Sequence, residues 1–366
     1  MSKLKVLELF GGIGACSKAL EQLGIDFEIV DYVEIDKYAV KSFNAIHGTN
    51  FEPQDICEWN KDIDVDLIMH GSPCQDFSLA GKQAGGDEGS GTRSSLMYET
   101  IRIVEKLKPK YVIWENVKNL LSKKHKHNFD AYLEIIQKLG YKNYYQVLNA
   151  KDYGIPQNRE RVFTISIRND IQKEFTFPKP IPLEKKLKDM LEENVDEKYY
   201  LSDKMIKYIS ADNEKWTGNN DKSLINKDIA SAINTGEGSR RCDASNYISS
   251  QVGENYNIKI KDEECINVQR VPLKFLNRNQ KNIDGDYAFC VDSCNNGGVK
   301  EVYKSRYHIR KLTPKECWRL MGFDGTDFDK ASQVCSNTQL YKQAGNSIVV
   351  NVLENILKNL LKEEIE

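Results

Sequence analysis

The chain has 366 residues, of which 40% are hydrophobic and 29% charged, and its formal net charge is −2 at pH 7. This length exceeds one ordinary domain, so two domains are expected, and the composition excludes a disordered or fibrous chain. The small net charge does not announce a nucleic-acid partner, although it leaves room for a local basic face. Neither a signal peptide nor an apolar run of membrane-spanning length is recognised, which predicts a cytoplasmic protein.

Nine cysteines are scattered along the chain without C-x-x-C spacing. An odd number in this pattern argues against a disulfide framework and against a zinc site. His125 and His127, in the stretch from Lys123 to Asn128, are interpreted as part of the solvated start of a helix rather than as metal ligands. No metal is therefore expected.

The first half of the chain alternates between strand-like and helix-like patterns. Apolar stretches predict strands at 5–10, 27–33, 64–70, 111–114, 144–149 and 162–167. Apolar residues at helical spacing predict helices at 15–23, 38–46, 96–107 and 129–139, the first two ended by Gly24 and Gly48. This alternation predicts an α/β fold with an open sheet, in which ligands bind at the carboxyl ends of the strands.

The composition and the pattern of the sequence change after the last of these predicted strands. A proline-rich stretch at 177–182 is typical of a linker, and residues 183–308 are rich in Asn, Asp, Lys, Ser and Gly without a strand–helix rhythm. Helical patterns return at Thr313, an N-cap followed by proline, and in the apolar run 348–361. A smaller, loop-rich second domain is therefore expected in the middle of the chain.

The stretch from Gly71 to Ser78 ends a predicted buried strand and delivers Cys74 into a glycine-rich loop. Pro73 fixes the backbone just before this cysteine and so holds the thiol in place. The glycines between 81 and 91 suit a segment that opens and closes. A cysteine in this position is typical of a nucleophile, and an inert buried thiol is the alternative.

Glycines also join the first predicted strand to the first helix, in Phe10-Gly11-Gly12-Ile13-Gly14. They allow a ligand to approach the backbone at the start of the helix. A nicotinamide dinucleotide site would have a third glycine in this motif, and the chain lacks it. Glu34, which follows the second strand, can accept hydrogen bonds from two ribose hydroxyls. The two features suit a nucleoside-containing cofactor, and a tight turn without a ligand is the alternative for the glycines.

One carboxylate and two arginines follow other predicted strands. Glu115 closes an apolar strand, so a raised pKa and a role as proton donor are expected, the alternative being an acid that pairs with a helix dipole. Arg159 and Arg161 alternate along the chain, which predicts that both face the same side. Two such guanidinium groups can hold a carboxylate, a base carbonyl or a phosphate, and a surface set of ion pairs is the alternative.

Taken in order, these motifs resemble the DNA cytosine-5 methyltransferase family of bacteria and phages. The matching segments are Phe10 to Gly14, Glu34, Asp55-Ile56, Pro73-Cys74-Gln75, Glu115-Asn116-Val117, Gln157 to Arg161, Arg310 to Phe323, and Gly345-Asn346-Ser347. The resemblance implies a Rossmann-like sheet that binds S-adenosylmethionine and a smaller, loop-rich target-recognition domain. The implied division is 1–172 for the catalytic and cofactor-binding domain, 173–308 for target recognition, and 309–366 for the return to the catalytic domain with its closing helix.

The resemblance implies a role for each residue of a catalytic set. The Cys74 thiolate would add to C6 of a flipped-out cytosine, C5 would take the methyl group of S-adenosylmethionine, and β-elimination would free the cysteine. Glu115 would bind the exocyclic amine and N3, where protonation relieves the charge that builds up during attack. Arg161 would hold the base O2 and orient Glu115, and Arg159 would support the loop and the nucleophile.

A pocket for S-adenosylmethionine is implied in the same way. Phe10 would pack on the adenine, Glu34 would take the ribose hydroxyls, and Asp55 would take the adenine amine. The other implied pocket residues are Gly12, Ile13, Gly14, Ile35, Ile56, Pro73, Leu96, Asn346 and Ser347. Many relatives have an aromatic residue at the position of Ile35, so stacking on the adenine is expected to be weaker here. The final helix would have to fold back beside the first strand.

The middle segment would read the DNA sequence, but the resemblance gives it no code. Candidates for contacts with bases or phosphates are Arg240, Arg241, Arg270, Arg278 and Gln280. The implied substrate is double-stranded DNA, bound by a monomer. A restriction endonuclease that cuts the same site would be the partner if the enzyme belongs to a restriction–modification pair.

Alternatives remain open at this point. A tRNA cytosine-5 methyltransferase of the same fold would use the same cysteine, but the long middle segment and the missing Cys-Phe-Thr signature favour DNA. A catalytically inactive DNA-binding relative would not need to retain Cys74, Glu115 and both arginines. A dinucleotide oxidoreductase is disfavoured by the missing glycine. An amino-methylating enzyme would have an Asp/Asn-Pro-Pro-aromatic loop, which Ser72-Pro73-Cys74 is not.

Overall fold

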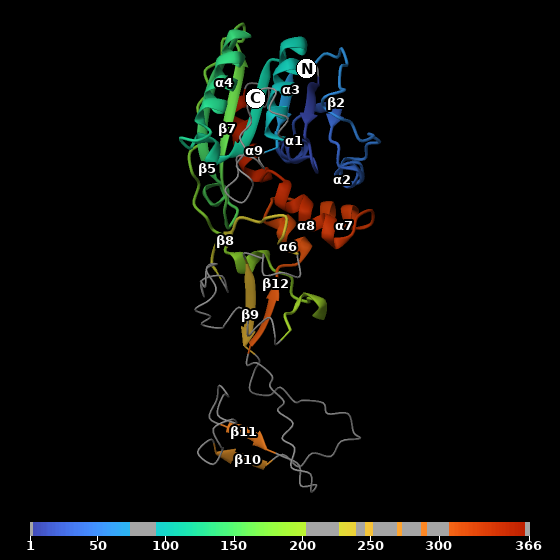
Figure 1. Ribbon diagram of the computed structural model, residues 1–366, viewed down its shortest axis with the longest axis vertical. Helices are drawn as coiled ribbons and strands as arrows, with labels where there is room; N and C mark the ends of the chain where they lie inside the picture. The colour runs from blue at the N-terminus through green and yellow to red at the C-terminus, as the bar shows by residue number, and fades with distance from the viewer. Residues whose placement is uncertain are drawn as a thin grey trace. The chain divides into compact units, whose positions relative to one another are not determined.

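The computed structural model describes residues 3–73, 93–202, 227–238, 246–251, 269–272, 287–290 and 307–362. The chain divides into two compact units, whose elements Figure 1 labels. Unit 1 comprises Met1–Tyr199, Asp221–Ile248 and Lys311–Glu366, and unit 2 comprises Tyr200–Asn220 and Ser249–Arg310. Of the residues singled out above, Cys74, Gln75, Arg240, Arg241, Arg278 and Gln280 lie outside the described part of the chain.

Unit 1 is built on a six-stranded sheet with the strand order β2-β1-β3-β4-β7-β5. Its strands are β1 (Leu4–Leu9), β2 (Phe27–Val33), β3 (Leu67–His70), β4 (Tyr111–Val117), β5 (Tyr141–Asn149) and β7 (Glu160–Arg168). The first four run parallel to one another, and β7 runs antiparallel to both of its neighbours. Because β1 has β2 on one side and β3 on the other, the order reverses there, and the carboxyl edge beside β1 is where open α/β sheets bind ligands.

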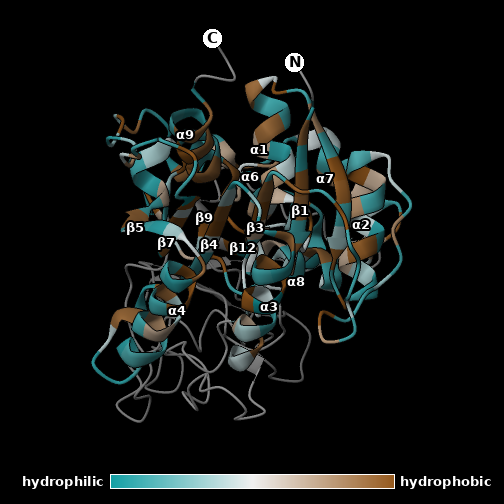
Figure 2. Ribbon diagram, turned by 90° about the horizontal axis from the view of Figure 1, so that it is seen from above, coloured by the Kyte–Doolittle hydropathy of each residue, from teal (hydrophilic) through white to brown (hydrophobic). Residues whose placement is uncertain are grey.

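Helices cover both faces of this sheet (Figure 2). One face carries α1 (Ala15–Leu23) and α9 (Val350–Leu360), and the other carries α3 (Met97–Leu107) and α4 (Lys126–Lys138). Successive strand residues alternate between the two cores, as Val6 and Leu7 do in β1. The closing helix α9 packs against α1 and shares a core with Val6, so the prediction that it folds back beside the first strand is confirmed.

The ends of several helices follow the sequence signals. Gly24 ends α1 and Gly48 ends α2 (Lys37–His47), both in the left-handed conformation that glycine adopts without strain. The Thr313 side chain accepts a hydrogen bond from the backbone N–H of Glu316 at the start of α6 (Pro314–Arg319), which has proline in its first turn. Two further helices complete this part of unit 1, α7 (Gly325–Ser332) and α8 (Asn337–Asn346).

Several elements extend beyond the range that local patterns predicted. The fourth strand continues to Val117, so Glu115 lies inside β4 rather than after it, because antiparallel pairing with β7 carries the strand on. The fifth strand begins at Tyr141, and α4 begins at Lys126. Pairing with β7, which comes later in the sequence, sets the two strand boundaries, and local spacing does not reveal it.

Part of the expected middle segment belongs to unit 1. Residues 183–199 contribute Leu187 and Met190 to its core, and β8 (Ala230–Ser231) pairs in parallel with β6 (Gln157–Asn158). Unit 2 holds an antiparallel pair formed by β10 (Gln269–Pro272), which includes Arg270, and β11 (Tyr287–Cys290). It also holds most of the pair β9 (Tyr247–Gln251) and β12 (Tyr307–Lys311). The functional division at 172 and 308 stays a prediction.

Candidate active site

Glu115 is buried in β4, and its partner comes from the neighbouring strand. The Nε atom of Arg161 lies 3.0 Å from Glu115 Oε1. Burial raises the pKa of the Glu115 carboxyl, and the cationic Arg161 and Arg159 offset part of this rise because they favour the charged form. The predicted rise in pKa is confirmed in direction. A buried carboxyl whose pKa lies above its ordinary value is better suited to donate a proton than an exposed carboxyl is.

The described residues that lead from β3 towards Cys74 lie next to this pair. The Nε1 atom of Trp114 donates a hydrogen bond to Ser72 Oγ at 3.0 Å, and Asn116 Nδ2 donates to the Ser72 carbonyl at 3.2 Å. A β-carbon at Gly71 would lie 3.7 Å from Glu115 Oε2. The chain therefore leaves β3 towards Cys74 directly beside the carboxylate.

A buried cluster of aromatic side chains packs next to Ser72 and the end of β3. The His70 ring stacks on Trp114 with an angle of 6° between the rings, and His70 Nε2 lies 2.9 Å from the hydroxyl of Tyr132. Burial lowers the pKa of His70 to about 3, so the ring is neutral at physiological pH. His70 is therefore a packing residue here, although histidine beside a nucleophile often acts as a base.

Arg159 is buried, and its hydrogen bonds go to backbone carbonyls rather than to a carboxylate. It lies between β6 and β7, and its buried guanidinium donates to the carbonyl of Ile233 at 2.8 Å, of Gly345 at 3.0 Å and of Ser347 at 2.8 Å. The expectation that both arginines face one side stays a prediction. Their partners differ, because Arg161 pairs with Glu115 whereas Arg159, where the strand is interrupted, binds three backbone carbonyls. Gly345 is needed for this approach, since a β-carbon there would lie 2.5 Å from the backbone of Asn234.

The glycine turn after β1 and the end of β2 form the other side of the site. Glu34 Oε2 accepts the backbone N–H of Gly12 at 3.2 Å, and Oε1 accepts that of Asp36 at 2.8 Å. Burial raises the pKa of the Glu34 carboxyl, and these two N–H groups oppose the rise. Gly12 and Gly14 have positive φ, and nothing lies within 4 Å of where a β-carbon on Gly12 would be. The backbone is therefore open to a ligand beside a fixed carboxylate.

Hydrophobic side chains lie beside the Glu34 carboxylate. Ile35 is 68% exposed, which is unusual for a large aliphatic side chain, and the partly buried Phe10 has a positive φ of 53°. Ile56 is buried, and Asp55 starts the turn in which it lies. An exposed apolar surface next to a hydrogen-bond acceptor fits a nucleoside, whose base is flat and whose ribose donates hydrogen bonds. The residues present therefore fit the adenosine part of S-adenosylmethionine.

The turn with Asp55 and Ile56 is fastened by residues that the sequence patterns did not single out. The buried Asp31 accepts hydrogen bonds from Gln54 Nε2 at 3.0 Å and Trp59 Nε1 at 2.7 Å. It also pairs with Lys61 Nζ at 2.7 Å. From the other side, Arg102 donates to the carbonyl of Ile56 at 3.0 Å and to that of Trp59 at 2.9 Å. An acid inside an otherwise apolar strand was the only sequence signal for this arrangement.

The other predicted pocket residues differ in burial. Ile13 and Ser347 are buried, and Pro73 and Leu96 are partly exposed. Asn346 is exposed at the end of α8. We call the part of the site around Glu115 and Arg161 the base end and the part around Gly12 and Glu34 the cofactor end, after their expected roles. Pro73 and Ser347 lie near the base end, since Pro73 follows Ser72 and the carbonyl of Ser347 binds Arg159.

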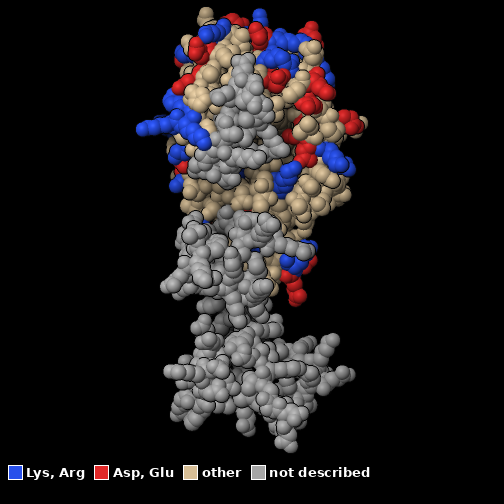
Figure 3. Space-filling view, in the orientation of Figure 1, with Lys and Arg blue, Asp and Glu red and all other residues tan. Residues whose placement is uncertain are grey.

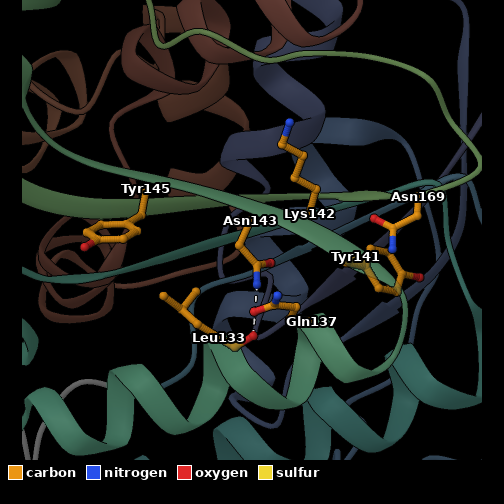
Figure 4. Close-up of a pocket in the computed structure, with 7 residues that line it drawn as sticks. All are labelled: Leu133, Gln137, Tyr141, Lys142, Asn143, Tyr145 and Asn169. Atoms are coloured by element: carbon orange, nitrogen blue, oxygen red, sulfur yellow. Dashed lines mark hydrogen bonds between the residues drawn. The ribbon is translucent and has the colours of Figure 1, made fainter.

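A hollow of about 410 Å³ between α4 and β5 lies away from this site (Figure 4). It is lined by Leu133, Gln137, Tyr141, Lys142, Asn143, Tyr145 and Asn169, and Asn143 donates to the carbonyl of Leu133 at 2.9 Å. Tyr141 pairs with Arg168 in the sheet, and Tyr111 at the start of β4 pairs with Ile167. The hollow is therefore at the amino edge of β4, opposite to Glu115.

Similarity to known proteins extends over nearly the whole chain. The family described as C-5 cytosine-specific DNA methylase matches residues 4–362. The chain belongs to this family. The orphan methyltransferase M.SPRI of Bacillus phage SPR is 34% identical, with 97% of each chain covered. The type II methyltransferase M2.ScrFI of Lactococcus lactis subsp. cremoris is 34% identical, with 99% of this chain and all of the relative covered.

Solved structures agree with this assignment at the level of the fold. A DNMT2 mutant from Spodoptera frugiperda matches with a TM-score of 0.68 at 20% identity, covering 98% of this chain and 100% of that one. A putative prophage-encoded DNA modification methyltransferase from E. coli matches with a TM-score of 0.58 at 18% identity, covering 98% and 99%. The α/β prediction is confirmed.

Membership of this family identifies the reaction class and the methyl donor. The chain is a DNA cytosine-5 methyltransferase, and the methyl donor of this family is S-adenosylmethionine, as predicted. The family supports DNA over tRNA as the substrate. In the described part of the chain, no helix is both long and apolar enough to cross a membrane.

Proposed function

We propose that the chain methylates C5 of cytosine within a short DNA sequence, with Cys74 as the nucleophile and Glu115 as the group that binds N3 of the base. The observation that carries this proposal is the 3.0 Å pair of Glu115 and Arg161 beside Gly71, three residues before Cys74. Attack of a thiolate on C6 pushes negative charge into the pyrimidine ring, and a carboxyl whose pKa is raised by burial can donate a proton to N3 and relieve that charge.

The arginines divide their work in this proposal. Arg161 orients Glu115 and has guanidinium N–H groups for the base O2. Arg159 fixes the segments around Ile233, Gly345 and Ser347 that surround the base end. Arg159 would also support the segment that carries Cys74, as the family resemblance implies.

S-adenosylmethionine supplies an electrophilic methyl group when it is bound. Glu34 would take its ribose hydroxyls, Asp55 its adenine amine, and Phe10, Ile35 and Ile56 its adenine faces. The other proposed pocket residues are Gly12, Ile13, Gly14, Pro73, Leu96, Asn346 and Ser347. The open backbone at Gly12 and the exposed Ile35 support this placement.

The proposal extends to partners. We infer that the substrate is double-stranded DNA, bound by one copy of the chain in the bacterial cytoplasm, with residues 173–308 as the target-recognition domain. The relative from phage SPR is named an orphan methyltransferase and the relative from Lactococcus a type II methyltransferase. Both situations, action alone or beside a cognate restriction endonuclease, are therefore compatible with the family.

Bisulfite sequencing of a mixed-sequence duplex incubated with the protein and S-adenosylmethionine tests the proposal. Protected cytosines within one short recurring sequence are expected. Cys74→Ser should abolish this protection and leave cofactor binding nearly intact. No protection on DNA, with methyl label entering tRNA instead, would overturn the DNA assignment. Loss of cofactor binding together with activity in Cys74→Ser would assign that residue a structural role.

A further inference from the structure

The turn between β4 and α4 carries a group of basic side chains that the site above does not use. We define this basic turn as residues 118–127. Its exposed residues are Lys118, Lys123, Lys124, Lys126 and His127. Figure 3 shows Lys and Arg side chains gathered on the side of unit 1 where Figure 1 draws α4 and β5. The sequence interpretation of a solvated helix start holds for the lysines, whereas the His125 side chain is buried.

The basic turn leaves the sheet at the base end of the site. It begins directly after β4, the strand that carries Glu115, and Val117 at the end of that strand pairs with Arg161. Its lysines therefore lie on the same edge of the sheet as the residues proposed to hold the cytosine. A duplex whose base reaches Glu115 has its backbone close to this edge.

The turn is anchored rather than loose. The backbone N–H groups of His125 and Lys126 both bind the carbonyl of Ser122, at 3.0 and 2.8 Å, and Ser122 N–H binds the carbonyl of Asn119 at 3.0 Å. The Leu120 side chain is fully buried beneath these bonds. Lysines on a fixed backbone lose less conformational freedom when they bind a ligand than lysines on a flexible tail do.

Two of the lysines carry charge that no described carboxylate neutralises. Lys118 pairs with Glu160 at 2.9 Å, and Lys126 pairs with Asp130 at 2.6 Å. Lys123 and Lys124 have no carboxylate partner among the residues that the structure describes. In a chain with a net charge of −2, such a local surplus is complementary to a polyanion. Duplex DNA carries about one negative charge per 1.7 Å of its axis.

We propose that Lys123 and Lys124 contact the phosphate backbone of the DNA duplex beside the flipped cytosine. The proposal rests on the proposed function and names a contact outside the segment expected to read the sequence. Phosphate contacts fix the position of a protein on DNA without reading bases. The two lysines therefore raise affinity for every DNA sequence and leave the choice of target to the segment 173–308 that is expected to read it.

The test measures DNA binding as a function of salt for the full-length protein. Lys123→Gln combined with Lys124→Gln removes both charges. Lys108→Gln combined with Lys138→Gln is the control, because these exposed lysines precede β4 and β5 at the opposite edge of the sheet. Fluorescence anisotropy with a duplex that contains the target sequence and with one that lacks it gives Kd at several salt concentrations. Lys123→Arg with Lys124→Arg keeps the charge.

The slope of log Kd against log salt should fall by about 1.8 in the Gln pair, with Kd roughly tenfold or more weaker at about 0.1 M salt on both duplexes. The Arg pair and the control should retain the slope of the original protein. An unchanged slope in the Gln pair, with cofactor binding intact, would overturn the proposal. Absence of methylation by the unaltered protein would instead overturn the proposed function, so the two failures are distinguishable.

Discussion

The base end and the cofactor end of the site each place a carboxylate at the carboxyl edge of the sheet, but they hold it differently. Glu115 meets the side chain of Arg161 across two antiparallel strands. Glu34 instead receives the backbone N–H groups of Gly12 and Asp36. Burial raises the pKa of both carboxyls. The two carboxylates therefore differ in the groups that bind them and not in the direction of the pKa shift that burial causes.

This difference predicts how each end of the site responds to substitutions. Backbone donors are set by the local fold, so the Glu34 carboxylate keeps its position when a neighbouring side chain changes. The base end depends on side chains that join distant segments, because Arg159 alone binds carbonyls of residues 233, 345 and 347. Substitutions at the base end should therefore alter rate or stability, and those at the cofactor end should alter affinity for S-adenosylmethionine.

The largest effect is expected from Glu115→Gln. Glutamine keeps the shape of the side chain but cannot donate a carboxyl proton to N3, so the rate of methyl transfer should fall roughly 1,000-fold. Single-turnover methylation at saturating DNA and cofactor measures the rate, and calorimetry should find cofactor affinity unchanged. Glu160→Gln, an exposed change at the start of the neighbouring strand, is the control. A rate within a few fold of the original would mean that Glu115 is not the proton donor.

Substitution of the two arginines should affect two different properties, the stability of the fold for Arg159 and the rate of methyl transfer for Arg161. In Arg159→Lys one ammonium replaces a guanidinium that binds three carbonyls, so unfolding by urea should become about 2–4 kcal/mol easier. Arg161→Lys loses only the fork beside Glu115 and should slow methyl transfer with little loss of stability. If Arg159→Lys unfolds at the original urea concentration, the carbonyls have found other donors and the clamp is not structural.

Local signals predicted the parts of this fold that are locally determined. Gly24, Gly48 and Thr313 end or begin helices as expected, because a left-handed glycine or a hydroxyl cap acts within one turn. The order of motifs also placed Glu34 and Glu115 at one edge of the sheet, since parallel strands deliver their carboxyl ends together.

What the sequence did not reveal depends on distant partners. The hydrogen-bond partners of Arg159 are carbonyls of residues 233, 345 and 347, which come much later in the chain. Likewise, Asp31 and Trp114 support the site through contacts that cross between elements. Residue type and spacing along one strand do not encode such contacts.

At the cofactor end, Glu34→Ala should raise the Kd for S-adenosylmethionine about tenfold, because a charged acceptor for the ribose is lost. Titration calorimetry without DNA measures this directly. Glu28→Ala, an exposed change in β2, the strand that precedes Glu34, should leave Kd unaltered. If Kd does not change in Glu34→Ala, the ribose lies elsewhere and the comparison of the two carboxylates loses its functional meaning.

The smallest effect, and the one that depends on pH, is expected from Asp31→Asn. Burial alone would raise the pKa of Asp31, but hydrogen bonds from Lys61, Trp59 and Gln54 hold it below its ordinary value. A carboxyl with a depressed pKa stabilises the fold above the pKa of the unfolded chain and loses that contribution as pH falls through the folded pKa. The substituted amide would accept fewer of these bonds than the carboxylate does, so stability at pH 7 should fall by about 1–2 kcal/mol.

The difference between the original protein and Asp31→Asn should therefore shrink as the pH falls below about 4, the region in which Asp31 takes up its proton. Urea unfolding at neutral and acid pH measures it, with Asp64→Asn, which removes an exposed pair with Lys5, as the control. A difference that stays constant with pH would show that the charge of Asp31 does not matter. The turn that carries Asp55 and Ile56 would then be held by Arg102, and the cofactor end would depend on a distant side chain as the base end does.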